Sequence, residues 1–148
     1  MALSDAQEAV LEELVSTVPA DVRWCVFGSA NLALRGLEAD PSDVDVLTAE
    51  AGAARIRDAL AAEFVGTGEV GVSQVDEYRI GGVELEVVYA ERAKDHQEPL
   101  ADLGTVELDR VRGVPILPPD ALVETYRRMG KDETAATLEE TFSDRSMG

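Results

Sequence analysis

The spacing of hydrophobic and polar residues along the chain predicts alternating helices and strands. The first helix begins at Ser4, because Gln7 three residues later completes a capping box and apolar residues then recur three or four positions apart. Short apolar runs that end at glycine or proline predict buried strands, and two alternating runs joined by Gly81-Gly82 predict a β-hairpin. The predicted strands cover residues 22–27, 43–47, 73–80, 83–89 and 111–116, and the predicted helices cover residues 4–18, 30–35, 48–64, 118–130 and a final segment that includes Leu138 and Phe142.

This order of elements, α-β-α-β-α-β-β-β-α-α, predicts a mixed α/β (α+β) fold in which helices pack against a mixed β-sheet. The chain has 148 residues, 45% of them hydrophobic, which is enough for one domain with a buried core. No repeat, low-complexity tract or linker divides it. We therefore expect a single domain over residues 1–148, with its core at about residues 20–90 and a carboxy-terminal helical part at about residues 118–143.

The charge of the chain is strongly negative, with 30 acidic residues against 13 basic residues and a formal net charge of −17. Phosphate groups attract basic surfaces, so this balance argues against a general DNA-binding or RNA-binding protein and against a binder of anionic membranes. No apolar run reaches transmembrane length, and the amino terminus does not resemble a signal peptide. The single cysteine, Cys25, cannot form an internal disulfide, and it is expected in the core with Trp24. The sequence thus predicts a cytoplasmic protein without a membrane partner.

The acidic residues are spread over the whole chain, and lysine is scarce, with Lys94 and Lys131 as the two lysines. This composition is typical of halophilic proteins, because the screening length falls to about 3 Å at molar salt and crowded carboxylates then repel one another less. The alternative is an acidic protein that binds a basic protein partner. Both interpretations stay open at this point.

The dipeptide Gly28-Ser29 lies between an apolar strand and a short helix. Glycine at this place allows a ligand to approach the backbone closely, and the amide groups and the Ser29 hydroxyl at a helix start suit a phosphate group. The same dipeptide also occurs in plain turns and helix caps, so by itself it does not define a site.

Four acidic residues occur in apolar strands, where an unpaired carboxylate costs free energy, namely Asp43, Asp45, Glu84 and Glu86. Asp43 and Asp45 project from one face of their strand, because side chains two residues apart point the same way. Glu86 in a later strand completes a three-carboxylate cluster if the two strands are neighbours, and such a cluster suits a hard divalent cation. In so acidic a chain these residues can also be solvated carboxylates, an alternative that fits Glu84 better than Glu86.

These motifs occur in a definite order along the chain. The segments are Val26-Phe27-Gly28-Ser29, a spacer at residues 30–42, Asp43-Val44-Asp45-Val46 and Leu85-Glu86-Val87. This order resembles the DNA polymerase β-like nucleotidyltransferase superfamily, especially its minimal and abortive-infection-type members. The resemblance covers about residues 22–89, and residues 113–119 with Lys131 are similar to the carboxy-terminal part of the abortive-infection-type branch. Antitoxin-like members carry an Arg-rich stretch where residues 30–35 are mostly apolar here, which favours the abortive-infection-type or small-molecule-modifying branches.

The resemblance implies a nucleotidyltransferase-like fold and a metal-dependent transfer of a nucleoside monophosphate from an NTP to a hydroxyl acceptor. It implies two Mg²⁺ ions, with Mn²⁺ as the alternative, and a base among the carboxylates, Glu86. The acceptor is open among a small molecule, an RNA end and a protein side chain. The implied catalytic and metal-ligating residues are Asp43, Asp45 and Glu86, and the implied nucleotide-binding residues are Gly28, Ser29 and Lys131.

Two other functions stay open. The chain can be a binding module of the same fold with a lapsed active site, such as a component of a toxin–antitoxin pair, or an acidic domain whose carboxylates only solvate it. Lys131 can equally stabilise a helix dipole. Arg35 and His96 are expected at the solvated surface.

Overall fold

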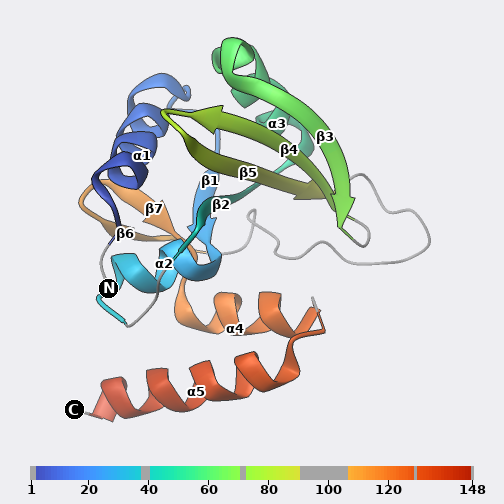
Figure 1. Ribbon diagram of the computed structural model, residues 1–148. Coiled ribbons are helices and arrows are strands. Elements are labelled where there is room, and N and C mark those ends of the chain that lie inside the picture. The colour runs from blue at the N-terminus through green and yellow to red at the C-terminus, as the bar shows by residue number, and fades with distance from the viewer. Residues whose placement is uncertain (1–2, 38–40, 71–72, 91–106, 129, 148) are drawn as a thin grey trace.

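The computed structural model describes residues 3–37, 41–70, 73–90, 107–128 and 130–147 (Figure 1). The helices are α1 (Asp5–Thr17), α2 (Gly28–Leu34), α3 (Glu50–Ala59), the 3-10 helix η1 (Ala61–Glu63), α4 (Pro119–Arg128) and α5 (Asp132–Met147). The strands are β1 (Trp24–Phe27), β2 (Asp43–Thr48), β3 (Phe64–Val70), β4 (Ser73–Ile80), β5 (Val83–Ala90), β6 (Asp109–Val111) and β7 (Val114–Ile116). Within the described ranges, no helix combines the length and the apolar character that a membrane span needs.

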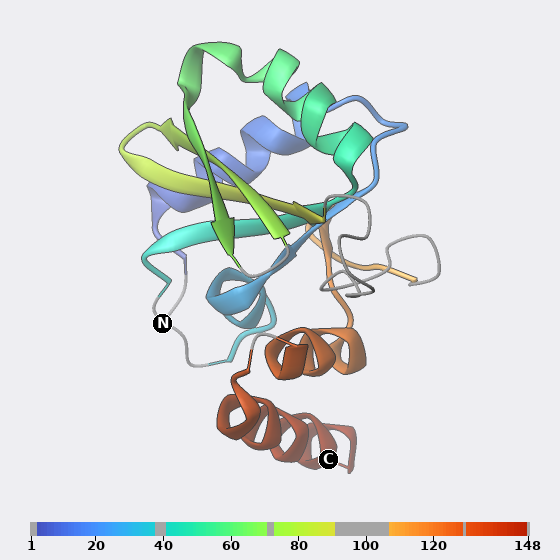
Figure 2. The ribbon, with the colours of Figure 1, turned by 90° about the vertical axis from the view of Figure 1, so that its right-hand side faces the viewer.

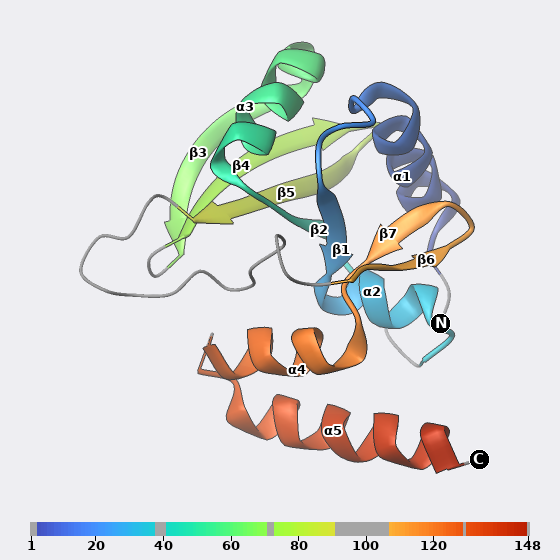
Figure 3. The ribbon, with the colours of Figure 1, turned by 180° about the vertical axis from the view of Figure 1, so that it is seen from behind.

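The described strands form one mixed sheet in the order β3-β4-β5-β2-β1-β7-β6. Strand β2 runs parallel to β5 and β1 runs parallel to β7, while the other neighbouring pairs are antiparallel. Helices α1 and α3 cover one face of the sheet, and α4 and α5 lie on the other (Figures 2 and 3). The predicted class, a mixed sheet flanked by helices, is confirmed.

Alternating side chains along the central strands build a hydrophobic core on each face of the sheet. Val44 and Val46 of β2 are fully buried in the core that includes α1 and α3. In β1, Trp24 belongs to this core and Cys25 belongs to the core under α4 and α5, so both residues are buried as predicted. The two aspartates of β2 occupy the alternate positions, and they therefore face the α4–α5 layer.

Two local predictions are confirmed. Ser4 caps α1, and the capping box is complete, because the Gln7 N–H donates to the Ser4 hydroxyl at 3.1 Å and the Ser4 N–H donates to Gln7 Oε1 at 2.9 Å. Gly81 and Gly82 join β4 to β5 with φ values of +57° and +82°. A two-residue hairpin turn of this kind needs positive φ, which glycine adopts without strain.

The segment after β2 differs from the predicted helix at residues 48–64. Thr48 ends β2, and its hydroxyl donates to the Arg23 carbonyl oxygen at 2.8 Å instead of capping a helix. Helix α3 is shorter than predicted, and Phe64 begins β3, an edge strand that includes Gly66 and Gly68. The prediction was wrong because these glycines resemble a loop in sequence, whereas a sheet edge tolerates them.

The predicted strand at residues 111–116 is a hairpin of two short strands, β6 and β7. Its turn consists of Arg112 and Gly113, with φ values of 51° and 81°. An arginine with positive φ carries no sequence signal of a turn, which explains why the hairpin was missed. The irregular stretch predicted near residues 92–104 lies outside the described residues.

Candidate functional site

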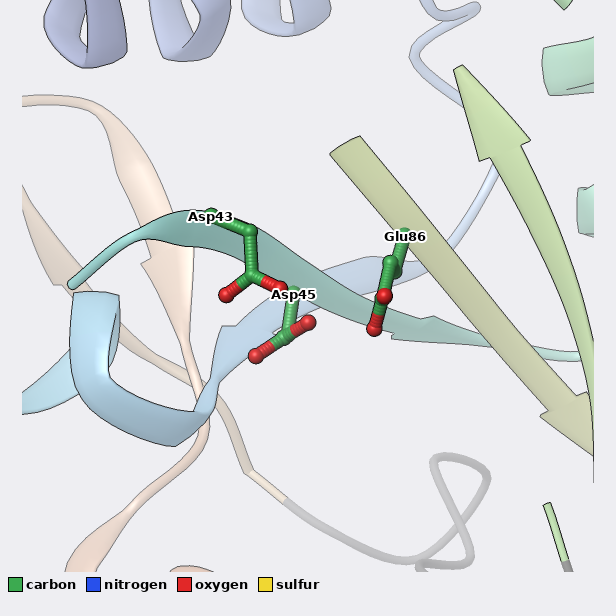
Figure 4. Close-up of side chains that lie close together, drawn as sticks. All are labelled: Asp43, Asp45 and Glu86. Carbon is green, nitrogen blue, oxygen red and sulfur yellow. The ribbon is translucent and has the colours of Figure 1, made fainter. Parts of the chain in front are cut away.

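The three acidic residues of the sequence motifs come together on the sheet face that carries α4 and α5. Strands β2 and β5 are parallel neighbours, with Asp45 opposite Glu86 and Asp43 opposite Glu84. One carboxylate oxygen from each of Asp43, Asp45 and Glu86 lies within 4.8 Å of the other two (Figure 4). These three residues are called the carboxylate cluster below. The predicted neighbourhood of the two strands is confirmed.

The Gly28-Ser29 turn lies beside the cluster because β1 is the other neighbour of β2, with Phe27 opposite Asp45. Gly28 has a φ of +69° and begins α2, earlier than the predicted helix start. A Cβ atom on Gly28 would lie 2.8 Å from Asp45 Oδ2. Glycine is therefore needed here for the backbone conformation and for the close approach of the Asp45 carboxylate.

A cavity of about 320 Å³ joins this turn, the cluster and the carboxy-terminal helices. Lys131 lies between α4 and α5, where its N–H donates to the Tyr126 carbonyl oxygen at 2.9 Å and its Nζ lies 5.9 Å from the centre of the Tyr126 ring. All of the sequence-predicted site residues line this cavity, whose lining consists of Phe27, Gly28, Ser29, Asp43, Asp45, Val75, Glu86, Val88, Tyr126 and Lys131.

Tyr126 of α4 is a lining residue that the sequence reasoning missed. Its side chain is only 8% exposed, so in the sequence it has the character of a core residue on the apolar face of a helix. Burial and the nearby Asp45 charge raise the pKa of Tyr126. The available signal was its place in the helix that leads directly to Lys131.

The cluster has little positive charge around it. Burial raises the pKa of Asp43, and the Glu84 carboxylate raises it further. Burial, the Asp43 charge and a hydrogen bond with Glu86 raise the pKa of Asp45 to about 8, against a smaller opposite effect of Lys131. No arginine or lysine in the described parts of the chain forms a salt bridge with the cluster.

The donor atoms of the cluster fit a hard divalent cation. All three are carboxylate oxygens, the ligand type that suits Mg²⁺ and Mn²⁺, and neither histidine nor cysteine belongs to the group. Carboxylates this close cannot all stay ionised without counter-charge, which a divalent cation supplies. The residues present therefore fit a divalent metal site.

Two other residues considered from the sequence are not part of this site. Arg35 was expected at the solvated surface, but its side chain is only 16% exposed. Its Nη2 donates to Asp109 Oδ2 at 2.9 Å and to the Leu117 carbonyl oxygen at 2.7 Å, so the expectation was wrong. His96 lies outside the described residues. The buried Cys25 also takes no part, since burial raises the pKa of its thiol to about 12.

No protein-family model matches the chain, and no curated protein matches it in sequence. A crystal structure of a candidate nucleotidyltransferase from Thermotoga maritima is similar to it, with a TM-score of 0.70, 23% identity and 97% of each chain covered. The crystal structure of ANT(2″)-Ia in complex with adenylyl-2″-tobramycin has a TM-score of 0.55 and 13% identity, and covers 97% of this chain and 99% of that chain. A solution structure of the antibiotic-resistance factor ANT(2″)-Ia has a TM-score of 0.53 and 14% identity, over 97% of this chain and 95% of that chain. The chain has the nucleotidyltransferase fold.

The nucleotidyltransferase fold was implied by the order of the sequence motifs, and this expectation is confirmed. The match extends over almost the whole chain, so it includes α4 and α5 as well as the sheet. At these levels of identity the likeness concerns the fold, and the chemistry has to be argued from the site itself.

Proposed function

We propose that this protein is a metal-dependent nucleotidyltransferase that moves a nucleoside monophosphate from an NTP to a hydroxyl group of an acceptor. The observation that supports this most is the carboxylate cluster, which shares one cavity with the Gly28-Ser29 turn and Lys131. In ANT(2″)-Ia, a protein of the same fold, the crystal structure holds adenylyl-2″-tobramycin. That fold therefore accommodates an adenylylated small molecule.

The carboxylate cluster holds the metal in this proposal. Asp43, Asp45 and Glu86 ligate a pair of Mg²⁺ ions, with Mn²⁺ as the alternative, and their oxygen-only donor set supports this choice. When bound, the ions neutralise the negative charge that develops on the phosphate oxygens during transfer.

The remaining residues of the cavity bind the nucleotide and handle the proton. The Ser29 hydroxyl donates to the terminal phosphates, and Lys131 contacts them as a point charge. Glu86 accepts the proton of the acceptor hydroxyl. The oxygen of that hydroxyl bonds to the α-phosphorus, and pyrophosphate leaves. The absence of a Cβ atom at Gly28 leaves room for the Asp45 carboxylate in this arrangement.

The acceptor enters from the side of Glu86 that faces β4. In an in-line displacement the attacking and leaving oxygens lie on opposite sides of the phosphorus, so the acceptor lies away from Ser29 and Lys131. On that side Glu86 also lines a smaller cavity of about 80 Å³ together with Glu77 and Glu84. Arg79 lines this cavity too and pairs with Glu84 at 3.1 Å, so Glu77 and Glu86 give the lining its net negative charge. That charge favours an uncharged or cationic small molecule over an RNA end.

The test measures Mg²⁺-dependent binding and transfer with α-labelled ATP, CTP, GTP and UTP, at low salt and at molar salt because of the net charge of −17. Asp45→Asn should lower transfer at least about a hundredfold, because a metal ion contributes several kcal/mol to such a reaction. Glu69→Gln is the matched control, since Glu69 is an exposed acid of the edge strand β3.

Two outcomes support the other functions. Tight binding of a basic protein without any nucleotide binding supports a binding module, such as a toxin–antitoxin component. If neither divalent cations nor NTPs bind, the carboxylates only solvate an acidic domain, and the proposal is wrong.

A further inference from the structure

Asn31 of α2 and Arg35 at its end tie this helix to the segment that leads into α4. Asn31 is fully buried, and its Nδ2 donates to the Val26 carbonyl oxygen at 2.8 Å and to the Leu117 carbonyl oxygen at 3.0 Å. Arg35 Nη2 donates to the same Leu117 oxygen at 2.7 Å, and Arg35 Nε donates to Asn31 Oδ1 at 2.9 Å. Two side chains at α2 therefore hold the carbonyl group that directly precedes Pro118.

Arg35 also contacts β6 and α5. Its Nη2 lies 2.9 Å from Asp109 Oδ2, and its guanidinium carbon lies 5.8 Å from the centre of the Phe142 ring. A guanidinium that is largely removed from solvent is stable only when its donors are paired. Arg35 thus connects α2, β6, the start of α4 and α5.

The two helices that Asn31 and Arg35 connect, α2 and α4, each adjoin a residue of the candidate site. Ser29 lies in the first turn of α2 and Lys131 follows α4, and both line the cavity of about 320 Å³. The carboxylate cluster belongs to β2 and β5. Asn31 and Arg35 do not contact these strands through any described hydrogen bond or salt bridge. A shift of α4 against α2 therefore changes the distance between Ser29 and Lys131 and leaves the carboxylates in place.

We propose that Asn31 and Arg35 are positioning residues for the nucleotide. They fix the start of α4 against α2 and so hold Lys131 at the distance from Ser29 that a bound triphosphate requires. This inference rests on the proposed function. Neither residue lines the cavity, so they act through Lys131. Nucleotide affinity consequently depends on them, while the affinity of the carboxylate cluster for a metal ion does not.

The test compares Arg35→Met with wild type in two binding measurements on the full chain. The first is the Kd of the NTP that wild type binds most tightly in the presence of Mg²⁺, and the second is the Kd of Mn²⁺ alone, followed by electron paramagnetic resonance. Arg35→Met should raise the Kd of the NTP about tenfold, because the displaced Lys131 loses one charge-assisted hydrogen bond to a phosphate group. It should leave the Kd of Mn²⁺ unchanged. The control is Arg55→Met, which should change neither Kd. Arg55 lies on α3 and forms an exposed salt bridge with Asp21.

A double variant distinguishes positioning from a general loss of stability. In the Lys131→Met background, Arg35→Met should weaken NTP binding no further, because its effect passes through Lys131. Two results would overturn this inference while leaving the proposed function in place. One is equal NTP affinity of Arg35→Met and wild type, and the other is additive losses of NTP affinity in the double variant. A wild type that binds no NTP overturns the proposed function as well. If Arg35→Met does not fold, Arg35→Lys serves with the same readouts, since it keeps the charge but cannot make all three hydrogen bonds of Arg35.

Discussion

Two carboxylates on the same sheet have opposite surroundings. Asp76 of β4 is fully buried and faces α3, where it accepts hydrogen bonds from three side chains. The donors are Arg57 Nη2 at 2.6 Å, Thr67 Oγ1 at 2.9 Å and the Tyr89 hydroxyl at 3.1 Å. These four residues are called the Asp76 network below.

Asp45 of β2 lies on the opposite face, and its close neighbours are the carboxylates of Asp43 and Glu86. Where Asp76 has an arginine and two hydroxyls, Asp45 has Lys131 as a more distant cation. A buried carboxylate needs counter-charge or hydrogen-bond donors in either case. The chain itself completes the Asp76 network, whereas the described residues offer the carboxylate cluster no comparable partner, and in our proposal a divalent cation completes it. The comparison therefore sets an acid that is paired within the fold against acids of the candidate site.

The largest expected effect on stability comes from removing the cation of the Asp76 network. Arg57→Met leaves the Asp76 charge buried without its ionic partner. This should lower the free energy of unfolding by about 3 kcal/mol, the lower end of the range for a broken buried pair, because the Arg57 side chain is 43% exposed and the two hydroxyls still donate to Asp76. Metal binding should survive, because the carboxylate cluster lies on the other face of the sheet. Denaturant unfolding and Mn²⁺ titration measure the two properties on the same variant.

Arg55→Met is the matched control, since Arg55 lies on the same helix but pairs with the exposed Asp21. An exposed pair of this kind contributes about 1 kcal/mol or less. If both variants lose equal stability, or if Arg57→Met loses its Mn²⁺ affinity, the two acidic regions are not independent and the comparison fails.

A second prediction concerns pH in the absence of divalent cations. The folded protein holds a proton on Asp45 up to about pH 8, whereas the unfolded chain releases it near the ordinary pKa of 3.8. The contribution of Asp45 to stability is therefore fully present below about pH 4 and is lost as the pH rises to about 8. The Tm of wild type should fall relative to that of Asp45→Asn across this interval.

Divalent cations should remove this dependence. Mg²⁺ or Mn²⁺ binds the ionised cluster, so its stabilising effect should grow with pH, reaching about 2.7 kcal/mol at a hundredfold excess over Kd. Thermal unfolding of both proteins, with and without Mn²⁺, measures the four curves. If the curves of Tm against pH without Mn²⁺ are parallel for wild type and Asp45→Asn, Asp45 titrates normally. The cluster then needs no additional counter-charge, and the prediction is wrong.

The sequence predicted the convergence of the three carboxylates better than it predicted the edges of the sheet. Alternation in β2 and β5 determines which side chains share a face, so the convergence of Asp43, Asp45 and Glu86 followed once the strands were neighbours. The order of the motifs, through the family resemblance, predicted that β2 and β5 are neighbours. Local periodicity alone does not specify which strands pair.

The features that were missed depend on tertiary contacts. Phe64 begins a strand because β4 pairs with it, although the residues before it have helical spacing. Arg35 is held by Asn31, Asp109 and the Leu117 carbonyl group, and the last two are far away in the sequence. Long-range hydrogen bonds of this kind leave no periodic pattern, so no reading of the sequence alone would have found them.

The smallest expected effect on stability concerns Gly28, whose backbone lies next to the Asp45 carboxylate. Gly28→Ala places an alanine at a φ of +69° and its Cβ 2.8 Å from Asp45 Oδ2, so the carboxylate has to move. The control is Gly36→Ala, because Gly36 has a φ of +82° but nothing within 4 Å of an added Cβ. Both variants should lose about 1–2 kcal/mol from the left-handed backbone, while only Gly28→Ala should also lose Mn²⁺ affinity. Equal Mn²⁺ affinity in the two variants would mean that the position of Asp45 does not determine metal binding, and the contrast with Asp76 would then be one of burial alone.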